Sequence, residues 1–125
     1  MQTMPRKPLQ VVLTAGPDEA AKARLGLEAA LAAVAAGLDV GLFLTLAAAD
    51  WACAERPTAN DADVYLLLDQ LQQLGVAVTC CARCAVQQCA DDRVATATGL
   101  AAGIDAVGLT QLVERVANGV PTVTF

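Results

Sequence analysis

Short apolar runs and one helical stripe alternate in the first half of the chain. Residues 9–14 are apolar and β-branched and stop at Ala15-Gly16-Pro17, and residues 40–46 form a second apolar run. Both runs predict strands that are buried on both faces. Between them, Pro17 suits the first turn of a helix and Gly37 suits its left-handed end. Apolar residues recur there at helical spacing: Leu27, Leu31, Val34 and Leu38. This strand–helix–strand order predicts a right-handed parallel crossover.

The middle of the chain predicts a loop, a helix and a short strand. Residues 47–60 predict a long irregular loop, after which Asn60 can cap a helix. The apolar stripe of that helix is Val64, Leu67, Leu68, Leu71 and Leu74. Gly75 ends the helix, and residues 76–79 form a third strand that runs directly into a group of cysteines.

The last third of the chain predicts two further helices and two strands. Residues 82–102 are expected to be partly helical, and residues 103–108 to form a fourth short strand between glycines. Thr110 is expected to cap a last helix. Residues 120–125 predict a final strand, which Pro121 restricts to a sheet edge or to the first residues of the strand.

Five strands that alternate with helices in 125 residues predict an α/β fold. We expect a small Rossmann-like, doubly wound sheet of about five mostly parallel strands with helices on both faces. Residues 9–125 form its single domain. Residues 1–8, which contain two prolines and two positive charges, are expected to be a flexible N-terminus.

The composition narrows the classes of function. Hydrophobic residues make up 56% of the chain, with 27 alanines among them, so the core is expected to be closely packed from small side chains. A net charge of −5, without a basic stretch interleaved with aromatic residues, disfavours nucleic acid as a partner. No apolar run reaches the roughly 20 residues of a transmembrane helix, so no membrane partner is expected. The N-terminus lacks the features of a signal peptide, and the expected location is cytoplasmic.

The chain has no histidine and five cysteines. The lack of histidine removes the commonest general base and nearly all histidine-ligated metal sites. Four of the five cysteines fall within ten residues, which in a reducing compartment indicates metal, redox or sulfur chemistry rather than a disulfide framework. Cys53 and Cys89 have no electrostatic reason to be reactive, so they are interpreted as small buried hydrophobic residues.

Cys81 and Cys84 are the candidate catalytic residues. They follow the third strand, and ligands of open α/β sheets bind beyond the carboxyl ends of the strands. If a helix begins near Cys81, both thiols share one face close to backbone N–H groups that stabilise a thiolate. Arg83 adds positive charge, and Cys80 and Arg83 are candidates for an auxiliary role.

Other interpretations of the cysteine cluster stay open. Cys80, Cys81, Cys84 and Cys89 could form a metal-binding module, although Cys81-x-x-Cys84 lacks a clear second pair. A thioredoxin-like redox site is another interpretation, although such a motif normally follows the first strand of its fold. Ala15-Gly16-Pro17 lacks the glycine pattern of a phosphate-binding loop. For the interpretation of Cys81 and Cys84 as catalytic residues, we predict no cofactor and no metal.

The order of elements and the position of the cysteines resemble the DsrE/DsrF-like (DsrE/TusD-like) family of small sulfur-transfer proteins. The resemblance extends from Leu9 to Phe125. It is carried by Gly75-Val76-Ala77-Val78 leading to Cys81-x-x-Cys84, by the stretch Gly-Leu-Thr-Gln-Leu-Val-Glu at 108–114, and by the terminal Val123-Thr124-Phe125.

The resemblance implies that a cysteine after the third strand accepts sulfur and carries it as a persulfide. That role falls on Cys81 first and on Cys84 second. A sulfur carrier or sulfurtransferase-like protein of this kind passes sulfur between donor and acceptor proteins, and the resemblance also implies homotrimers, homohexamers or heteromeric rings. Many members have an Arg-Gly a few residues after the cysteine, where this chain has Val86-Gln87-Gln88-Cys89. The alternative function is a non-catalytic oligomeric binding or assembly subunit.

Overall fold

The computed structural model describes residues 5–56, 61–89 and 99–125. Five strands form one sheet in the order β4-β3-β2-β1-β5. The strands are β1 (Pro8–Leu13), β2 (Asp39–Leu44), β3 (Ala77–Cys81), β4 (Asp105–Val107) and β5 (Thr122–Thr124). Every neighbouring pair is parallel, so the carboxyl ends of all five strands meet at the same end of the sheet. The predicted α/β fold class is confirmed.

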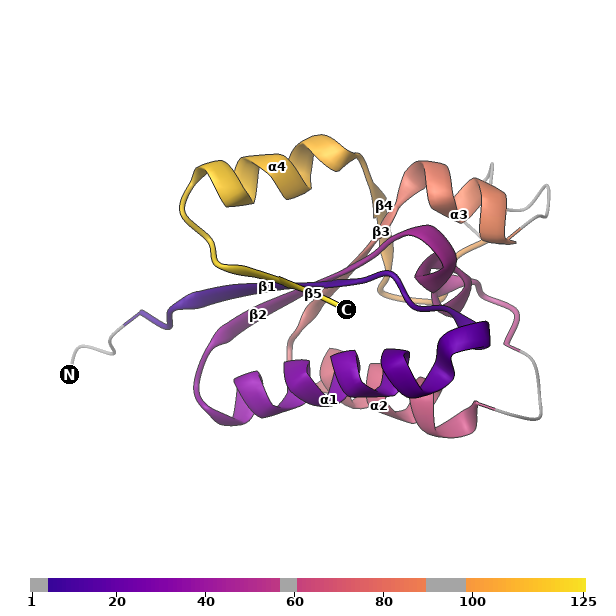
Figure 1. Ribbon diagram of the computed structural model, residues 1–125, viewed down its shortest axis with the longest axis horizontal. Helices are drawn as coiled ribbons and strands as arrows, with labels where there is room; N and C mark the ends of the chain where they lie inside the picture. Colours follow the sequence, from indigo (N-terminus) through magenta and orange to yellow (C-terminus); the bar gives the residue numbers. More distant parts are fainter. Residues whose placement is uncertain (1–4, 57–60, 90–98) are drawn as a thin grey trace.

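Helices cover both faces of the sheet. The α-helices are α1 (Ala20–Ala35), α2 (Ala62–Gln73), α3 (Ala82–Cys89) and α4 (Leu109–Ala117), and two 3₁₀ helices are η1 (Pro17–Glu19) and η2 (Leu46–Ala52). The helices α1 and α2 lie on one face, and α3 and α4 lie on the other (Figure 1). Within the described residues, no helix is long and apolar enough to cross a membrane.

The core is formed by the central strands together with residues of α1, α2, η2 and the start of α3. The buried residues of β1 and β2 come in unbroken runs, as expected for parallel strands covered on both faces. The buried face of α1 consists of small residues and one leucine: Ala23, Gly26, Leu27, Ala30 and Ala33. A Cβ at Gly26 would lie 2.7 Å from the Cδ1 of Leu13, so this glycine allows α1 to approach β1 closely.

Several predicted boundaries hold. Gly37 and Gly75 have φ of 87° and 88°, the left-handed conformation expected of glycines that end helices. The final strand, β5, pairs with β1 alone and lies at the edge of the sheet, where Pro121 directly precedes it. The predicted start of the last helix is wrong: α4 begins at Leu109 with Gly108 at the N-cap position, so Thr110 lies inside the helix.

The predicted loop at 47–60 is wrong in its first half. The 3₁₀ helix η2 occupies Leu46–Ala52 and buries four of its residues: Ala48, Ala49, Trp51 and Ala52. Trp51 holds this segment in place, because its indole N–H donates to the carbonyl oxygen of Ala15 at 2.8 Å. The proposed cap Asn60, and the part of the predicted 82–102 helix that falls at 90–98, lie outside the described residues.

Candidate functional site

The cysteines of the predicted site lie at the carboxyl end of the sheet. The strand β3 is longer than the predicted residues 76–79 and ends at Cys81, so Cys80 and Cys81 belong to the strand. The helix α3 begins at the next residue and carries Cys84 near its start. The register pairs Leu44 of β2 with Cys80, so Thr45, the residue after β2, leaves the sheet beside Cys81. This end of the sheet is where ligands of parallel α/β folds bind.

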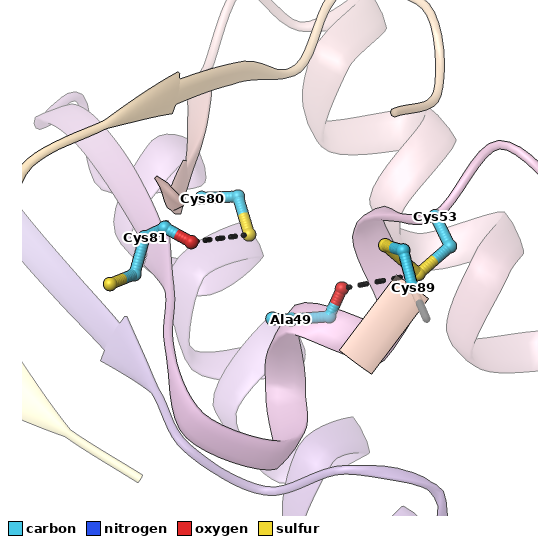
Figure 2. Close-up of a disulfide and its surroundings, with 5 residues drawn as sticks. All are labelled: Ala49, Cys53, Cys80, Cys81 and Cys89. Atoms are coloured by element: carbon cyan, nitrogen blue, oxygen red, sulfur yellow. Dashed lines mark hydrogen bonds between the residues drawn. A yellow bond between two sulfur atoms is a disulfide. The ribbon is translucent and has the colours of Figure 1, made fainter. Parts of the chain in front are cut away.

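Cys80 and Cys81 point to opposite sides of the sheet, as successive residues of a strand do. Figure 2 shows the sulfur of Cys80 directed toward the carbonyl oxygen of Cys81, which accepts from the Cys80 thiol at 3.6 Å. Cys80 is fully buried, and burial raises the pKa of its thiol to about 12. Cys80 therefore remains a neutral thiol at physiological pH and does not act as a nucleophile there.

Cys84 is the thiol with donors arranged around it. Its Sγ accepts a hydrogen bond from the backbone N–H of Leu46 at 3.2 Å. The hydroxyl of Thr45 lies 3.5 Å from the same sulfur and can donate to a thiolate. Both donors come from the segment that joins β2 to η2, so the end of one strand supplies the environment for a cysteine that follows another.

These donors change the acidity of Cys84. Burial is the largest single influence and raises the pKa of the thiol. Hydrogen bonds from Thr45, Leu46 and Cys81 oppose it, and the charge of Arg83 adds to their effect, so the pKa of Cys84 falls below its ordinary value. A lower pKa means that more of this cysteine is thiolate at neutral pH, and the thiolate is the nucleophilic form. No histidine is needed for this activation.

The backbone that supplies one of these donors is in an uncommon conformation. Leu46 has φ of 53°, and it is the only non-glycine residue with positive φ among the described residues. Its side chain is 61% exposed, so packing of the leucine side chain does not explain the conformation. Such conformations often occur at functional sites, where the strain positions a group. Here the conformation accompanies an N–H that is directed at the sulfur of Cys84.

The interpretation of Cys53 and Cys89 as unpaired core residues is wrong. They form a disulfide, with their Cα atoms 5.4 Å apart and a sequence separation of 36 (Figure 2). Cys53 follows η2 directly and Cys89 is the last residue of α3, so packing of these two elements brings the sulfurs together. The free cysteines are Cys80, Cys81 and Cys84.

The metal interpretation finds no ligand set in the part of the chain that the structure describes. No group of three or more cysteine or carboxylate side chains there could hold an ion. Of the four cysteines considered as ligands, Cys89 is bonded to Cys53, and Cys80 points away from Cys81. What the site brings together is the pair Cys81 and Cys84, with the exposed Arg83 between them in sequence.

Comparison with known protein families shows to which family this chain is related. The profile of the DsrE/DsrF-like family matches residues 7–125. The chain belongs to this family. Members of the DsrE/DsrF-like family are generally related to sulfur transfer. None of the curated proteins with which the sequence was compared matches it.

Solved structures with the same fold agree with this membership. The YchN protein of E. coli is 20% identical with a TM-score of 0.72, over 96% of this chain and 99% of that one. A conserved protein of unknown function from Bacteroides thetaiotaomicron is 19% identical with a TM-score of 0.67, over 95% of each chain. At these identities the likeness shows the fold alone.

The sequence predicts the cysteines of this site but not the residues that act on Cys84. The apolar run at 40–46 predicts that Thr45 and Leu46 end a strand, yet they contact the sulfur of Cys84. A signal for Thr45 was present, since a residue that follows a neighbouring parallel strand lies at the same end of the sheet as Cys81. The N–H of Leu46 could not be found in this way, because its direction depends on the backbone conformation.

Thr45→Val is expected to raise the pKa of Cys84 while leaving the fold in place. Valine has nearly the shape of threonine but cannot donate to the thiolate, so we expect a shift of about half a unit or more toward the ordinary value. The rate of alkylation of Cys84, followed against pH by peptide mass spectrometry, measures this shift. Thr79→Val is the matched control, because the Thr79 hydroxyl donates to the carbonyl of Leu42 and not to a cysteine. Equal profiles for Thr45→Val and the wild type would contradict the assignment.

Proposed function

We propose that this protein carries sulfur as a persulfide on Cys84, with Cys81 as the second thiol of the site. The observation that carries the proposal is the pair of donors on the sulfur of Cys84, from the Leu46 N–H and the Thr45 hydroxyl. They stabilise the negative charge of the Cys84 thiolate, which is the form that attacks the donor. Membership of a family related to sulfur transfer supports the same function.

The loading step is a displacement at sulfur. The thiolate of Cys84 attacks the outer sulfur of a donor persulfide, R–S–SH. The bond between the two donor sulfurs breaks, the donor leaves as a thiolate, and the outer sulfur with its proton remains on Cys84 as Cys84–S–SH. No oxidant or reductant is consumed, because the transferred sulfur keeps its oxidation state.

The unloading step has two routes that use the same intermediate. A thiolate of an acceptor protein can attack the outer sulfur and take it away, which regenerates Cys84. Alternatively, the thiolate of Cys81 attacks the inner sulfur of Cys84–S–SH, forms a Cys81–Cys84 disulfide and releases the outer sulfur as sulfide. The two cysteines are then oxidised by two electrons and the sulfane sulfur is reduced by two, so the second route needs a reductant before the next cycle.

The order of the two thiols differs from the order that the family resemblance implies. The resemblance gives the acceptor role to Cys81 first. We assign it to Cys84, because its sulfur receives the donors of Thr45 and Leu46 and its pKa is lowered. Cys81 is 4% exposed and Cys84 is 9% exposed, so both are shielded from bulk solvent. Shielding suits a persulfide, which must survive until the acceptor protein arrives.

We propose that the protein works in the cytosol as a homotrimer or homohexamer, with donor and acceptor proteins as its further partners. The helix α4 supports an association of copies, because it has no buried residue and exposes Leu109, Val113 and Val116 at helical spacing. Light scattering coupled to gel filtration is expected to give three or six times the mass of 12.8 kDa. A mass of one chain at micromolar concentration would contradict the assembly.

One observation favours a second function, that of a non-catalytic binding or assembly subunit. The thiols of Cys81 and Cys84 are nearly covered in the single chain. If the two thiols were never accessible to other molecules, the cysteines would only contribute to core packing. The exposed apolar residues of α4 would then be the functional surface. The reactivity of the thiols in the native protein separates the two functions.

Sulfur loading of the wild-type protein tests the proposed function. The protein, with its free thiols reduced, is exposed briefly to a low-molecular-weight persulfide, and its intact mass is recorded. We expect an increase by the mass of one sulfur atom per chain, which a reductant removes. An unchanged mass, together with slow alkylation of the three free thiols in the native state, would support the assembly subunit instead.

A further inference from the structure

The helix that carries Cys84 is joined to η2 at both of its ends. Near the start of both elements, the N–H of Leu46 donates to the Sγ of Cys84 at 3.2 Å. At the other end, Cys53, which caps η2, is bonded to Cys89, the last residue of α3. The two elements therefore run side by side in the same direction. The non-covalent contact at one end is the one that activates Cys84, and the covalent contact lies at the other.

The position of α3 depends mainly on its packing against η2, since its contacts with β3 and β4 are few. The helix has eight residues and buries only Cys84 and Ala85, and a helix of this length is not stable by itself in water. A cavity of about 460 Å³ borders it and leaves room for a shift. The cavity is lined by Ala82, Ala85, Val86, Leu100, Ile104, Asp105 and Ala106. Loss of the covalent bond to η2 would therefore allow the whole of α3 to shift.

Both states of the disulfide fit the surrounding structure. Cys89 is half-buried, so its sulfur is the one that a reductant reaches first. The Sγ of Cys53 lies 3.8 Å from the carbonyl oxygen of Ala49 (Figure 2). The bridged sulfur has no proton to donate, but the reduced thiol has one and finds its acceptor already in place. Reduction thus leaves the buried Cys53 thiol with an acceptor.

We propose that the Cys53–Cys89 disulfide is a redox-controlled tether that holds α3 against η2 and thereby sets the reactivity of Cys84. With the tether closed, the Leu46 N–H and the Thr45 hydroxyl remain on the sulfur of Cys84. With the tether open, α3 is free to move toward the neighbouring cavity, and Cys84 loses these donors. The tether deepens the proposed function by adding regulation of the same thiol, so it rests on that function for its biological meaning.

The switching step is an exchange between the tether and a dithiol. One thiolate of the dithiol attacks the sulfur of Cys89, and Cys53 leaves as a thiolate that takes up a proton. The second thiol of the dithiol then attacks the mixed disulfide and releases Cys89 as a thiol. Two electrons pass from the dithiol, which becomes a disulfide, to the tether. A low-molecular-weight disulfide closes the tether by the reverse exchange.

The groups that lower the pKa of Cys84 come from three different elements. Thr45 precedes η2 and Leu46 is its first residue, Cys81 belongs to β3, and Arg83 belongs to α3. Opening of the tether separates Cys84 from Thr45 and Leu46. Arg83 moves together with Cys84. The expected change is therefore a higher pH for the appearance of the thiolate, rather than a complete loss of reactivity.

The experiment compares the full-length protein with the tether closed and open. Thiol titration under denaturing conditions is expected to give three thiols for the closed form and all five after treatment with dithiothreitol, which is then removed. Alkylation of Cys84 by iodoacetamide is measured against pH for both forms. We expect the inflection to lie at least about half a pH unit higher in the open form. The plateau rate at high pH separately reports how accessible the sulfur is.

A double variant provides the matched control. Cys53→Ala with Cys89→Ala is expected to behave like the reduced wild type and to be insensitive to dithiothreitol. If this variant does not fold, the reduced wild type carries the comparison alone. Identical inflections in the closed and open forms would overturn the proposal, as would five free thiols after treatment with oxidised glutathione. Because alkylation reads Cys84 directly, failure of sulfur loading with a shifted inflection would count against sulfur transfer and not against the tether.

Discussion

Cys84→Ser is expected to lose sulfur loading almost completely while keeping the fold. A serine hydroxyl fits the position of the thiol and can still accept from the Leu46 N–H, but it is not ionised at neutral pH and cannot form a persulfide. We expect the loaded fraction to fall by about tenfold or more, since an activated nucleophile is removed. Intact mass after exposure to a persulfide donor measures the loss, and near-ultraviolet circular dichroism verifies the fold.

Cys81→Ser is the informative comparison for this variant. If Cys84 is the acceptor, Cys81→Ser still takes up sulfur but cannot release sulfide by forming the Cys81–Cys84 disulfide. Loading should therefore persist, and sulfide production without an acceptor should stop. Full loading of Cys84→Ser together with no loading of Cys81→Ser would instead return the acceptor role to Cys81, as the family resemblance implies.

Trp51→Ala is expected to produce the largest loss of stability. Trp51 is fully buried, its N–H donates to the carbonyl of Ala15, and its ring meets Tyr65 edge to face with centroids 5.4 Å apart. Removal of such a side chain leaves a cavity and an unpaired carbonyl, and costs about 3–5 kcal/mol of the free energy of unfolding. This is a large part of the roughly 5–15 kcal/mol that stabilises a typical domain. Urea unfolding followed by circular dichroism measures the change.

Leu66→Ala is the control for this prediction. Leu66 is also apolar and lies on α2, but it is 63% exposed, so its truncation should change the free energy of unfolding by less than about 0.5 kcal/mol. A similar small change for Trp51→Ala would show that η2 is not anchored by this residue. Because η2 begins with the residue whose N–H contacts Cys84, partly folded Trp51→Ala protein should also show a raised pKa for that thiol.

The strands and helix ends could be predicted from local sequence because local physics decides them. Buried parallel strands require unbroken apolar runs, and residues 9–14 and 40–46 have them. Left-handed helix ends favour glycine, and Gly37 and Gly75 supply it. The helix η2 has no such signal, because its sequence has no regular apolar repeat. Its position is fixed instead by a tertiary contact, the hydrogen bond from Trp51 to Ala15 just after β1.

The site was predictable only in part for a related reason. The rule that ligands bind beyond the carboxyl ends of parallel strands located Cys81 and Cys84, since it depends on topology alone. The disulfide between Cys53 and Cys89 depends on how η2 packs against α3, and cysteine spacing does not contain that information. The expectation of a reducing compartment argued further against it.

The position of the transferred sulfur is the most direct test of the central claim. Trypsin cleaves after Arg83, so Cys81 and Cys84 fall on two peptides, which the Cys53–Cys89 disulfide keeps linked in a digest without reductant. After brief exposure to a persulfide donor and blocking of the remaining thiols, peptide mass spectrometry with fragmentation assigns the extra sulfur to one cysteine. The account predicts a persulfide on Cys84 of the peptide that begins at that residue. No persulfide on either peptide, with Cys84 unreactive in the native protein, would contradict it.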